Sequence, residues 1–168
     1  MVTFEAQRVA VLIDVQNMYW SARTMYKARV NFKEVMRTAA QNRTLVKALA
    51  YVVTSGTKQE ENFFEALKKE GFEIKNKPLQ VFYGGAKKAD WDVGLAMDAV
   101  RLGEKMDVIC IVSGDGDFAP LASYLKERGT IVRVIAFGRS SSKQLVDEAD
   151  EFVDMDKEQG RFLIKSKK

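Results

Sequence analysis

The amino-acid sequence predicts a three-layer α/β/α sandwich with a mainly parallel sheet. Two runs rich in β-branched residues, 8–14 (RVAVLID) and 107–115 (DVICIVSGD), are too short for helices and are apolar almost throughout, as strands buried on both faces are. Segments with helical periodicity separate these runs from similar ones. Strands that alternate with helices favour right-handed crossovers and a parallel sheet that is covered on both faces.

The remaining elements follow from the same patterns. Residues 45–56 (LVKALAYVVTSG) and 130–138 (TIVRVIAFG) predict two further strands, although the opening of the first could extend a helix instead. The segment 75–85 (KNKPLQVFYGG) adds a shorter strand. Gly71 and Gly129 stand where a helix C-terminus favours a left-handed residue. Helices are expected over four ranges: 17–27, 58–71, 91–105 and 117–129.

Length and composition indicate one domain. The chain has 168 residues, 46% of them hydrophobic, which is enough for a core without disulfides or a structural metal. The single cysteine, Cys110, lies in an apolar run and is expected to be a buried hydrophobe, so a disulfide framework is excluded and a reducing compartment fits. No apolar stretch reaches the roughly 20 residues that span a bilayer, and the N-terminus lacks the features of a signal peptide. We therefore expect a cytoplasmic protein without membrane contact.

The net charge of +4 belongs to the end of the chain. Residues 157–168 contain five basic residues and one acidic residue, so residues 1–156 carry 22 charges of each sign. The sequence thus predicts a neutral single domain over 1–156 and a basic tail over 157–168. The tail is either a solvated, frayed terminus or an electrostatic contact for a polyanion.

The chain contains no histidine, and this excludes Ser-His-Asp and Cys-His catalysis as well as zinc sites built on imidazole. A catalytic centre must therefore consist of carboxylates, lysines and hydroxyls. Carboxylate and carbonyl oxygens suit the hard cations Mg²⁺ and Mn²⁺. Metal-dependent hydrolysis or phosphoryl transfer becomes the leading class of function.

Three acids stand at predicted strand ends. Asp14 ends the first strand, and Asp115 and Asp117 follow the strand over 107–113. In a parallel sheet these ends meet at one edge, where ligands bind next to the topological switch point. The glycines on either side of Asp115 suit a tight turn that lets the backbone approach a ligand. Asp117 could instead cap the helix that it opens.

A second acidic group lies at the helix over 91–105. Asp90 and Asp92 stand at its start, whereas Asp98 lies within its apolar stripe and needs a cation, a lysine or a hydroxyl as partner. Asp92 and Asp98 do not share a face of a regular helix. Asn17, three residues after Asp14, either caps the following helix or orients a substrate or a water molecule.

Four segments together resemble the NYN domain family, in its LabA-like branch, of the PIN-like nuclease superfamily. They are LIDVQNMY (12–19), KKADWDVGLAMDAV (87–100), IVSGDGDFAPLASYLKERG (111–129) and ADEFVDM (149–155). The match runs in order from about Arg8 to Met155. It implies a PIN-like (Rossmannoid) parallel sandwich whose acidic residues hold Mg²⁺ or Mn²⁺ and cleave RNA.

By this resemblance, four aspartates match the acidic metal-site positions of the family: Asp14, Asp92, Asp115 and Asp117. Asn17 and Asp98 match its other polar positions, and Ser113 begins its SGD turn. The chain departs from the family pattern at Asp90 and Trp91, where relatives more often carry a small and an aliphatic residue. The resemblance implies a ribonuclease in which Asp14 and Asp115 bind the cation directly, Asp92 and Asp117 bind it directly or through water, and Asn17 positions a group.

A polyanion needs basic surroundings to approach an acidic centre. We expect these from Lys87, Lys88, Arg139, Ser141 and Lys143, with Ser141 in a serine run that either holds a phosphate or caps the next helix. Three aromatic residues either stack unpaired bases or pack in the crevice: Tyr19, Trp20 and Trp91. Single-stranded RNA is the expected substrate.

The main alternative is a non-catalytic NYN module that binds RNA, a nucleotide or a partner protein in a regulatory role. A dinucleotide-binding enzyme is disfavoured, because DVQN follows the first strand in place of a glycine-rich phosphate turn. Phosphotransfer on aspartate has no support beyond acids at strand ends. The sequence leaves the oligomeric state open, a homodimer included.

Overall fold

The computed structural model describes residues 2–81, 83–85, 87–88 and 90–166. Six parallel strands form the central sheet, in the order β4-β3-β1-β7-β8-β9. β1 (Arg8–Asp14) and β7 (Val108–Val112) are the middle pair, and all residues of β7 are buried. Their bounds agree with the two apolar runs from which the parallel sheet was predicted.

The outer strands flank this pair on both sides. β3 (Thr44–Thr54) and β4 (Glu73–Pro78) lie beyond β1, and β8 (Ile131–Ala136) and β9 (Glu151–Asp154) lie beyond β7. Thr44–Thr54 is strand throughout, so the helical alternative for the opening of that run is wrong. β4 ends at Pro78 at the edge of the sheet, where a residue without a backbone N–H is tolerated.

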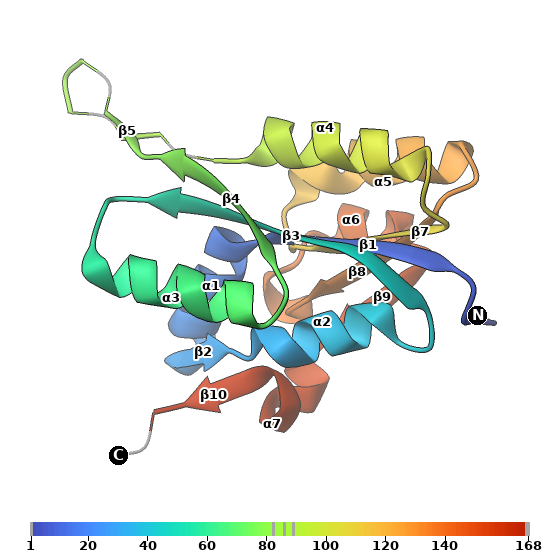
Figure 1. The fold of residues 1–168 in the computed structure, drawn as a ribbon, viewed down its shortest axis with the longest axis horizontal. Coiled ribbons are helices and arrows are strands. Elements are labelled where there is room, and N and C mark those ends of the chain that lie inside the picture. Colours follow the sequence, from blue (N-terminus) through green and yellow to red (C-terminus); the bar gives the residue numbers. More distant parts are fainter. Residues whose placement is uncertain (1, 82, 86, 89, 167–168) are drawn as a thin grey trace.

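Helices cover both faces of the sheet, which confirms the three-layer prediction (Figure 1). On one side lie α1 (Val15–Tyr26), α2 (Phe32–Ala40) and α3 (Lys58–Lys69). On the other lie α4 (Asp92–Gly103) and α5 (Ala119–Glu127), and α6 (Lys143–Glu148) packs against α5. Gly71 and Gly129 have φ angles of +103° and +86°, so both provide the left-handed residue expected after α3 and α5.

The path of the chain creates a switch point between β1 and β7. From β1 the chain moves outward to β3 and β4, then returns through α4 to β7 and continues outward to β8 and β9. The connections that leave β1 and β7 therefore diverge to opposite faces. In a parallel sheet this divergence leaves a crevice at the carboxyl ends of the two strands.

Several short elements were not predicted. β2 (Ala28–Val30) and α2 follow α1 directly, and β6 (Lys87–Lys88) precedes α4. In place of the one shorter strand expected over 75–85, the structure has β4 and β5 (Gln80–Val81), and β5 pairs with β6. The signal for α2 was present: Asn31 accepts a hydrogen bond from the Glu34 N–H as the N-cap, and Phe32, Val35 and Ala39 form the buried stripe.

The C-terminal segment differs from the expected tail. The 3-10 helix η3 (Met155–Glu158), α7 (Gln159–Phe162) and β10 (Leu163–Lys165) continue the folded unit, and β10 pairs antiparallel with β2. Phe162 is fully buried, and the Arg161 guanidinium donates to the Thr38 hydroxyl at 2.7 Å. A frayed tail from residue 157 is therefore wrong as far as Lys165, because two of its apolar residues, Phe162 and Leu163, have a place in the core.

None of the helices in the described part of the chain is long and apolar enough to cross a membrane.

We expect Phe162→Ala to lower the free energy of unfolding by about 3–5 kcal/mol, since it leaves a cavity under α2 and α7. Urea denaturation followed by circular dichroism measures the change. Ile164→Ala is the matched control, because that side chain is 43% exposed and its loss should cost less than about 0.5 kcal/mol. Equal effects of the two substitutions would contradict the packing of this segment.

Candidate metal centre

Asp14 lies where β1 passes directly into α1. It is the last residue of the strand and the N-cap of the helix, and its Oδ1 accepts a hydrogen bond from the Asn17 N–H at 3.1 Å. Its Oδ2 accepts from the Ser113 hydroxyl at 3.3 Å. Both carboxylate oxygens are thus oriented by neutral donors, one from α1 and one from the end of β7.

Asp115 lies in the tight turn after β7. Its N–H donates to the buried Ser113 hydroxyl at 3.2 Å, and its Oδ1 accepts from the Asp117 N–H at 2.9 Å as the N-cap of the 3-10 helix η1 (Gly116–Phe118). The Asn17 side chain accepts from the Gly114 N–H at 3.1 Å. Asn17 therefore does not cap α1 with its side chain but links the start of α1 to the turn that carries Asp115.

Gly114 is required by a close approach of two loops. A Cβ at this position would lie 2.7 Å from the Ser141 hydroxyl oxygen and 3.0 Å from the Ser141 Cα. The Ser142 N–H also donates to the Gly114 carbonyl at 2.9 Å. The turn after β7 is thus held between α1 and the loop that follows β8.

Asp92 is the first residue of α4, and the residue before it anchors the start of this helix. The Trp91 indole N–H donates to the Val52 carbonyl at 2.7 Å, and its ring packs edge-on against Tyr51, with 5.5 Å between the centroids. The Lys77 ammonium donates to the Asp90 carbonyl at 3.1 Å. A Cβ at Gly94 would lie 2.5 Å from the Trp91 ring, so only glycine allows the indole this place against the helix.

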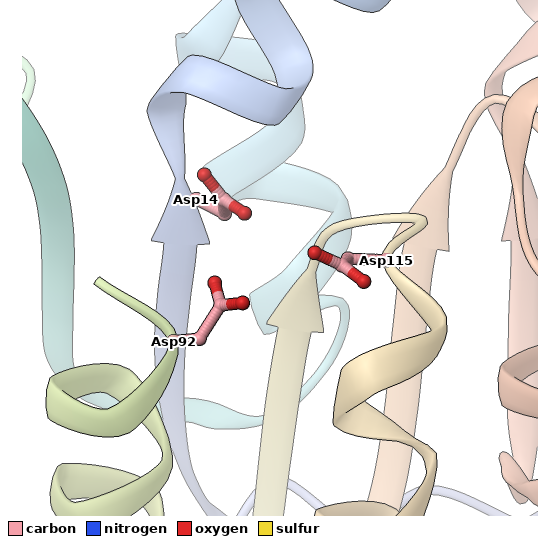
Figure 2. Close-up of side chains that lie close together, drawn as sticks. All are labelled: Asp14, Asp92 and Asp115. Atoms are coloured by element: carbon pink, nitrogen blue, oxygen red, sulfur yellow. The ribbon is translucent and has the colours of Figure 1, made fainter. Parts of the chain in front are cut away.

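These three elements bring Asp14, Asp92 and Asp115 together. One carboxylate oxygen from each lies within 4.8 Å of the others, and all three side chains are half-buried. Figure 2 shows them converging from the end of β1, the start of α4 and the turn after β7. They lie at the switch point between β1 and β7, where a parallel sheet binds its ligands.

Like charges in this cluster perturb its acids. The pKa of Asp92 is raised to about 6 by burial and then by the negative charges of Asp115, Asp90, Asp14 and Asp117. The pKa of Asp14 is also raised, mainly by burial, although its hydrogen bonds from Asn17 and Ser113 oppose the shift. Within the described residues, none of the three aspartates forms an ion pair with lysine or arginine.

The donor set therefore fits a divalent cation. Three carboxylates at this spacing offer hard oxygen ligands, which Mg²⁺ and Mn²⁺ prefer, and a cation would remove the repulsion among them. The prediction of an oxygen-ligand site was made from the absence of histidine and from the acids at strand ends, and the structure brings together three of the four aspartates expected.

The fourth aspartate, Asp117, lies outside the close cluster. Its side chain is exposed beyond Asp115, and its carboxylate is not among the three that converge, although its charge contributes to the raised pKa of Asp92. Asp90 is half-buried, its Oδ1 accepts from the Asp92 N–H at 3.3 Å, and its charge raises the pKa of both Asp14 and Asp92. Both residues are therefore neighbours of the cluster.

Asp98 has a different place. Its carboxylate accepts from the Tyr51 hydroxyl at 2.7 Å and lies 3.5 Å from Arg101 and 4.0 Å from Lys75. The partners that the sequence requires for Asp98 are thus one hydroxyl and two basic side chains. Burial, and then the charge of Asp98, raise the pKa of Tyr51. Asp98 supports Tyr51, which in turn packs against Trp91 beside Asp92.

The residues expected to bind phosphate differ in their contacts. Ser141 lies against Gly114, and its hydroxyl donates to the Phe137 carbonyl at 2.7 Å. Arg139 lies 3.6 Å from Asp156, and Lys143 lies 2.7 Å from Asp147. The side chains of Lys87 and Lys88 lie outside the described residues. Ser142 occupies the N-cap position of α6 without a side-chain capping bond.

Of the three aromatic residues expected near the site, one is packed and two are exposed. Trp91 is held before α4 by the Val52 carbonyl and the Tyr51 ring, so the packing alternative applies to it. Tyr19 and Trp20 are exposed on α1. The sequence does not point to Lys77 or Tyr51 as site residues. No local signal marks them, because they lie on strands and contact residues on α4 or just before it, which are distant in the sequence.

Fold and site together define a three-layer α/β domain with an acidic cluster at its switch point. The chain belongs to the NYN domain family, whose model matches residues 8–156. This confirms the resemblance seen in the four sequence segments.

Two individual proteins are similar to it. The low amplitude and bright protein LabA of Synechococcus elongatus is 24% identical over 167 residues, which cover 90% of this chain and 86% of that protein. The crystal structure of a protein of unknown function from Vibrio parahaemolyticus has a TM-score of 0.88 and 34% identity, and the match covers 98% of this chain and all of that one. The fold is therefore shared along the whole domain.

We expect Mn²⁺ binding to depend on pH in the range of the Asp92 pKa, about 6. Its folded pKa lies above the ordinary value of 3.8, so below pH 6 a proton occupies the carboxylate and competes with the cation. Affinity should fall at least roughly tenfold from about pH 7 to about pH 5 and level off above pH 7. The stability of the metal-free protein should change in the opposite direction, falling as pH rises from about 4 to about 6.

Isothermal titration calorimetry at three pH values measures the affinity. Asp92→Asn is the control, because it removes the titrating group and should flatten the dependence. The same affinity at all three pH values in the unmodified protein would contradict the role of Asp92 as a titrating ligand.

Proposed function

We propose that this protein is a metal-dependent endoribonuclease that hydrolyses phosphodiester bonds of single-stranded RNA. The observation that carries the proposal is the convergence of Asp14, Asp92 and Asp115 within 4.8 Å at the switch point, with no ion pair to neutralise them among the described residues. Membership of the NYN domain family supports it.

The residues around the acidic cluster have different roles in the proposed reaction. Asp14, Asp92 and Asp115 would hold Mg²⁺ or Mn²⁺, which when bound activates a water molecule and neutralises charge on the scissile phosphate. Asn17 and Ser113 keep Asp14 and the turn of Asp115 in register through their hydrogen bonds. The exposed carboxylate of Asp117, two residues beyond Asp115, is available to orient water or to accept its proton, since the chain has no histidine for this step.

Basic residues near the same edge would admit the polyanion. Arg139 and Lys143 lie in the segment after β8, and their side chains are 63% and 89% exposed. The Lys143–Asp147 ion pair is exposed on both sides and contributes little, about 0–1 kcal/mol, so a phosphate can replace its carboxylate partner. We assign phosphate binding also to Lys87 and Lys88, which precede α4 in the sequence. Ser141 would support this binding.

Asp115→Asn tests the catalytic proposal most directly, because asparagine keeps the oxygen that caps η1 and removes the charge that holds a cation. We expect cleavage of labelled RNA in Mn²⁺ to fall by at least about 100-fold, the upper end of what loss of a mere supporting residue costs a metal site. Asp147→Asn, on the exposed side of α6, is the matched control and should cleave as the unmodified protein does.

Equal cleavage by the Asp115→Asn variant and the unmodified protein would mean that another site or a contaminant is responsible. RNA binding and Mn²⁺ binding without cleavage by the unmodified protein would instead identify the non-catalytic alternative, a module that binds RNA, a nucleotide or a partner protein. The calorimetric and cleavage measurements together separate these two outcomes.

Substrate form is tested by a hairpin that carries a labelled stem and a labelled unpaired loop of the same sequence. We expect faster cleavage in the unpaired strand, because unstacked bases can reach the exposed aromatic residues next to the site, whereas paired bases cannot. Comparable rates in stem and loop would overturn the preference for single strands and leave the metal-dependent chemistry untouched.

A further inference from the structure

The outer face of α1 carries aromatic and then basic side chains in order. Tyr19 and Trp20 are 41% and 55% exposed, and Arg23 and Thr24 follow one turn later, also exposed. The opposite face is buried through Val15, Met18 and Ala22. At 100° per residue, the exposed positions span less than half of the helix circumference, so they form one continuous strip.

This strip begins at the candidate metal centre. Asp14 is the N-cap of α1, so the first helical turn lies beside the acidic cluster. The 12 residues of the helix extend about 18 Å away from it. Tyr19 and Trp20 thus lie about 8–9 Å along the axis from Asp14, and the basic residues lie farther out.

The strip continues beyond the helix. Lys27 follows α1 in the left-handed conformation, with a φ angle of 48°, and leads into β2, where Arg29 is exposed. β10 pairs with β2 so that Lys165 lies opposite Ala28 and Ile164 opposite Arg29. Figure 1 shows α1, β2 and β10 following one another on one side of the sheet. Lys165 therefore shares a face of this two-stranded sheet with buried Ala28, whereas Ile164 shares the opposite face with Arg29, so the strip ends at Arg29.

The positive charges of the strip are not neutralised. Arg23, Lys27 and Arg29 form no ion pair with any residue that the structure describes. Some exposed bases elsewhere, such as Lys47 and Lys143, do lie within 3.0 Å of a carboxylate. Unpaired bases in a row attract a phosphate backbone, and exposed aromatic rings beside them offer stacking faces for unpaired bases.

We propose that the outer strip of α1, made of Tyr19, Trp20, Arg23, Lys27 and Arg29, is the surface that binds single-stranded RNA on its way from the metal centre. Tyr19 and Trp20 stack the bases nearest the cleaved bond, and the basic residues hold the phosphates that follow. The inference rests on the proposed function for the place of cleavage but not for binding. About 18 Å of helix accommodates roughly five stacked nucleotides at 3.4 Å each.

The aromatic pair is tested by RNA binding in EDTA, where metal-dependent cleavage does not interfere. The probe is a fluorescein-labelled, unstructured RNA of about 12 nucleotides, read by fluorescence anisotropy. Trp20→Ala should raise Kd roughly 5- to 150-fold, and Trp20→Phe, which keeps a ring, should restore most of the affinity. Tyr124→Ala is the matched control, because Tyr124 is 40% exposed on α5 in the opposite layer and lies under Arg128.

The basic part is tested by salt dependence. In the double variant Arg23→Gln/Lys27→Gln, the slope of log Kd against log salt should decrease by about 1.4, or about 0.7 for each lost phosphate contact with a single strand. Arg128→Gln should leave the slope unchanged.

The outcomes distinguish this surface from the nuclease proposal. If the unmodified protein cleaves RNA while the Trp20 and Arg23/Lys27 variants bind as it does, the strip is overturned and the nuclease stands. If these variants lose binding and nothing is cleaved, the strip stands as an RNA surface and the nuclease fails. No RNA binding by the unmodified protein, or equal losses in the Tyr124 and Arg128 controls, overturns the strip. Melting temperatures within about 2 °C of the unmodified protein verify that these surface variants remain folded.

Discussion

Repulsion among carboxylates at the end of the central strands is the constraint that the surrounding structure has to meet. Asp14, Asp92 and Asp115 converge within 4.8 Å, and burial together with the neighbouring negative charges raises the pKa of Asp92 to about 6. The groups that hold them are neutral: the Ser113 hydroxyl, the Asn17 amide and backbone N–H groups. An arginine in their place would have neutralised the cluster, and a divalent cation would then have had little to gain there.

Each acid is fixed by a contact between elements that are distant in sequence. Asn17 binds the turn after β7, Ser141 fills the space over Gly114, and the Trp91 indole binds the end of β3. These contacts cross the switch point, so the strand order of the sheet and the geometry of the acidic cluster depend on one another. A change in packing at Trp91 or Gly114 therefore reaches the aspartates without touching them.

The sequence predicts the parts of this arrangement that follow from strand ends, and it fails where side chains meet across the sheet. Asp14 and Asp115 were placed at one edge because carboxyl ends of parallel strands share an edge. Asp98 needed a partner, but Tyr51 could not be named from spacing, since it comes from a neighbouring strand. The basic charge of residues 157–165 predicts a solvated tail, whereas the burial of Phe162 and Leu163 makes this segment part of the fold.

The position of that C-terminal segment also changes the meaning of the net charge. A neutral domain with a separate basic tail would attract RNA without directing it. Pairing of β10 with β2 instead places Lys165 beside the basic end of α1, while the opposite end of α1 begins at the acidic centre. The phosphates of an RNA strand are therefore attracted to the basic end of the helix and repelled at the acidic end. A cation bound at the acidic end would remove the repulsion there and leave the attraction at the basic end unchanged.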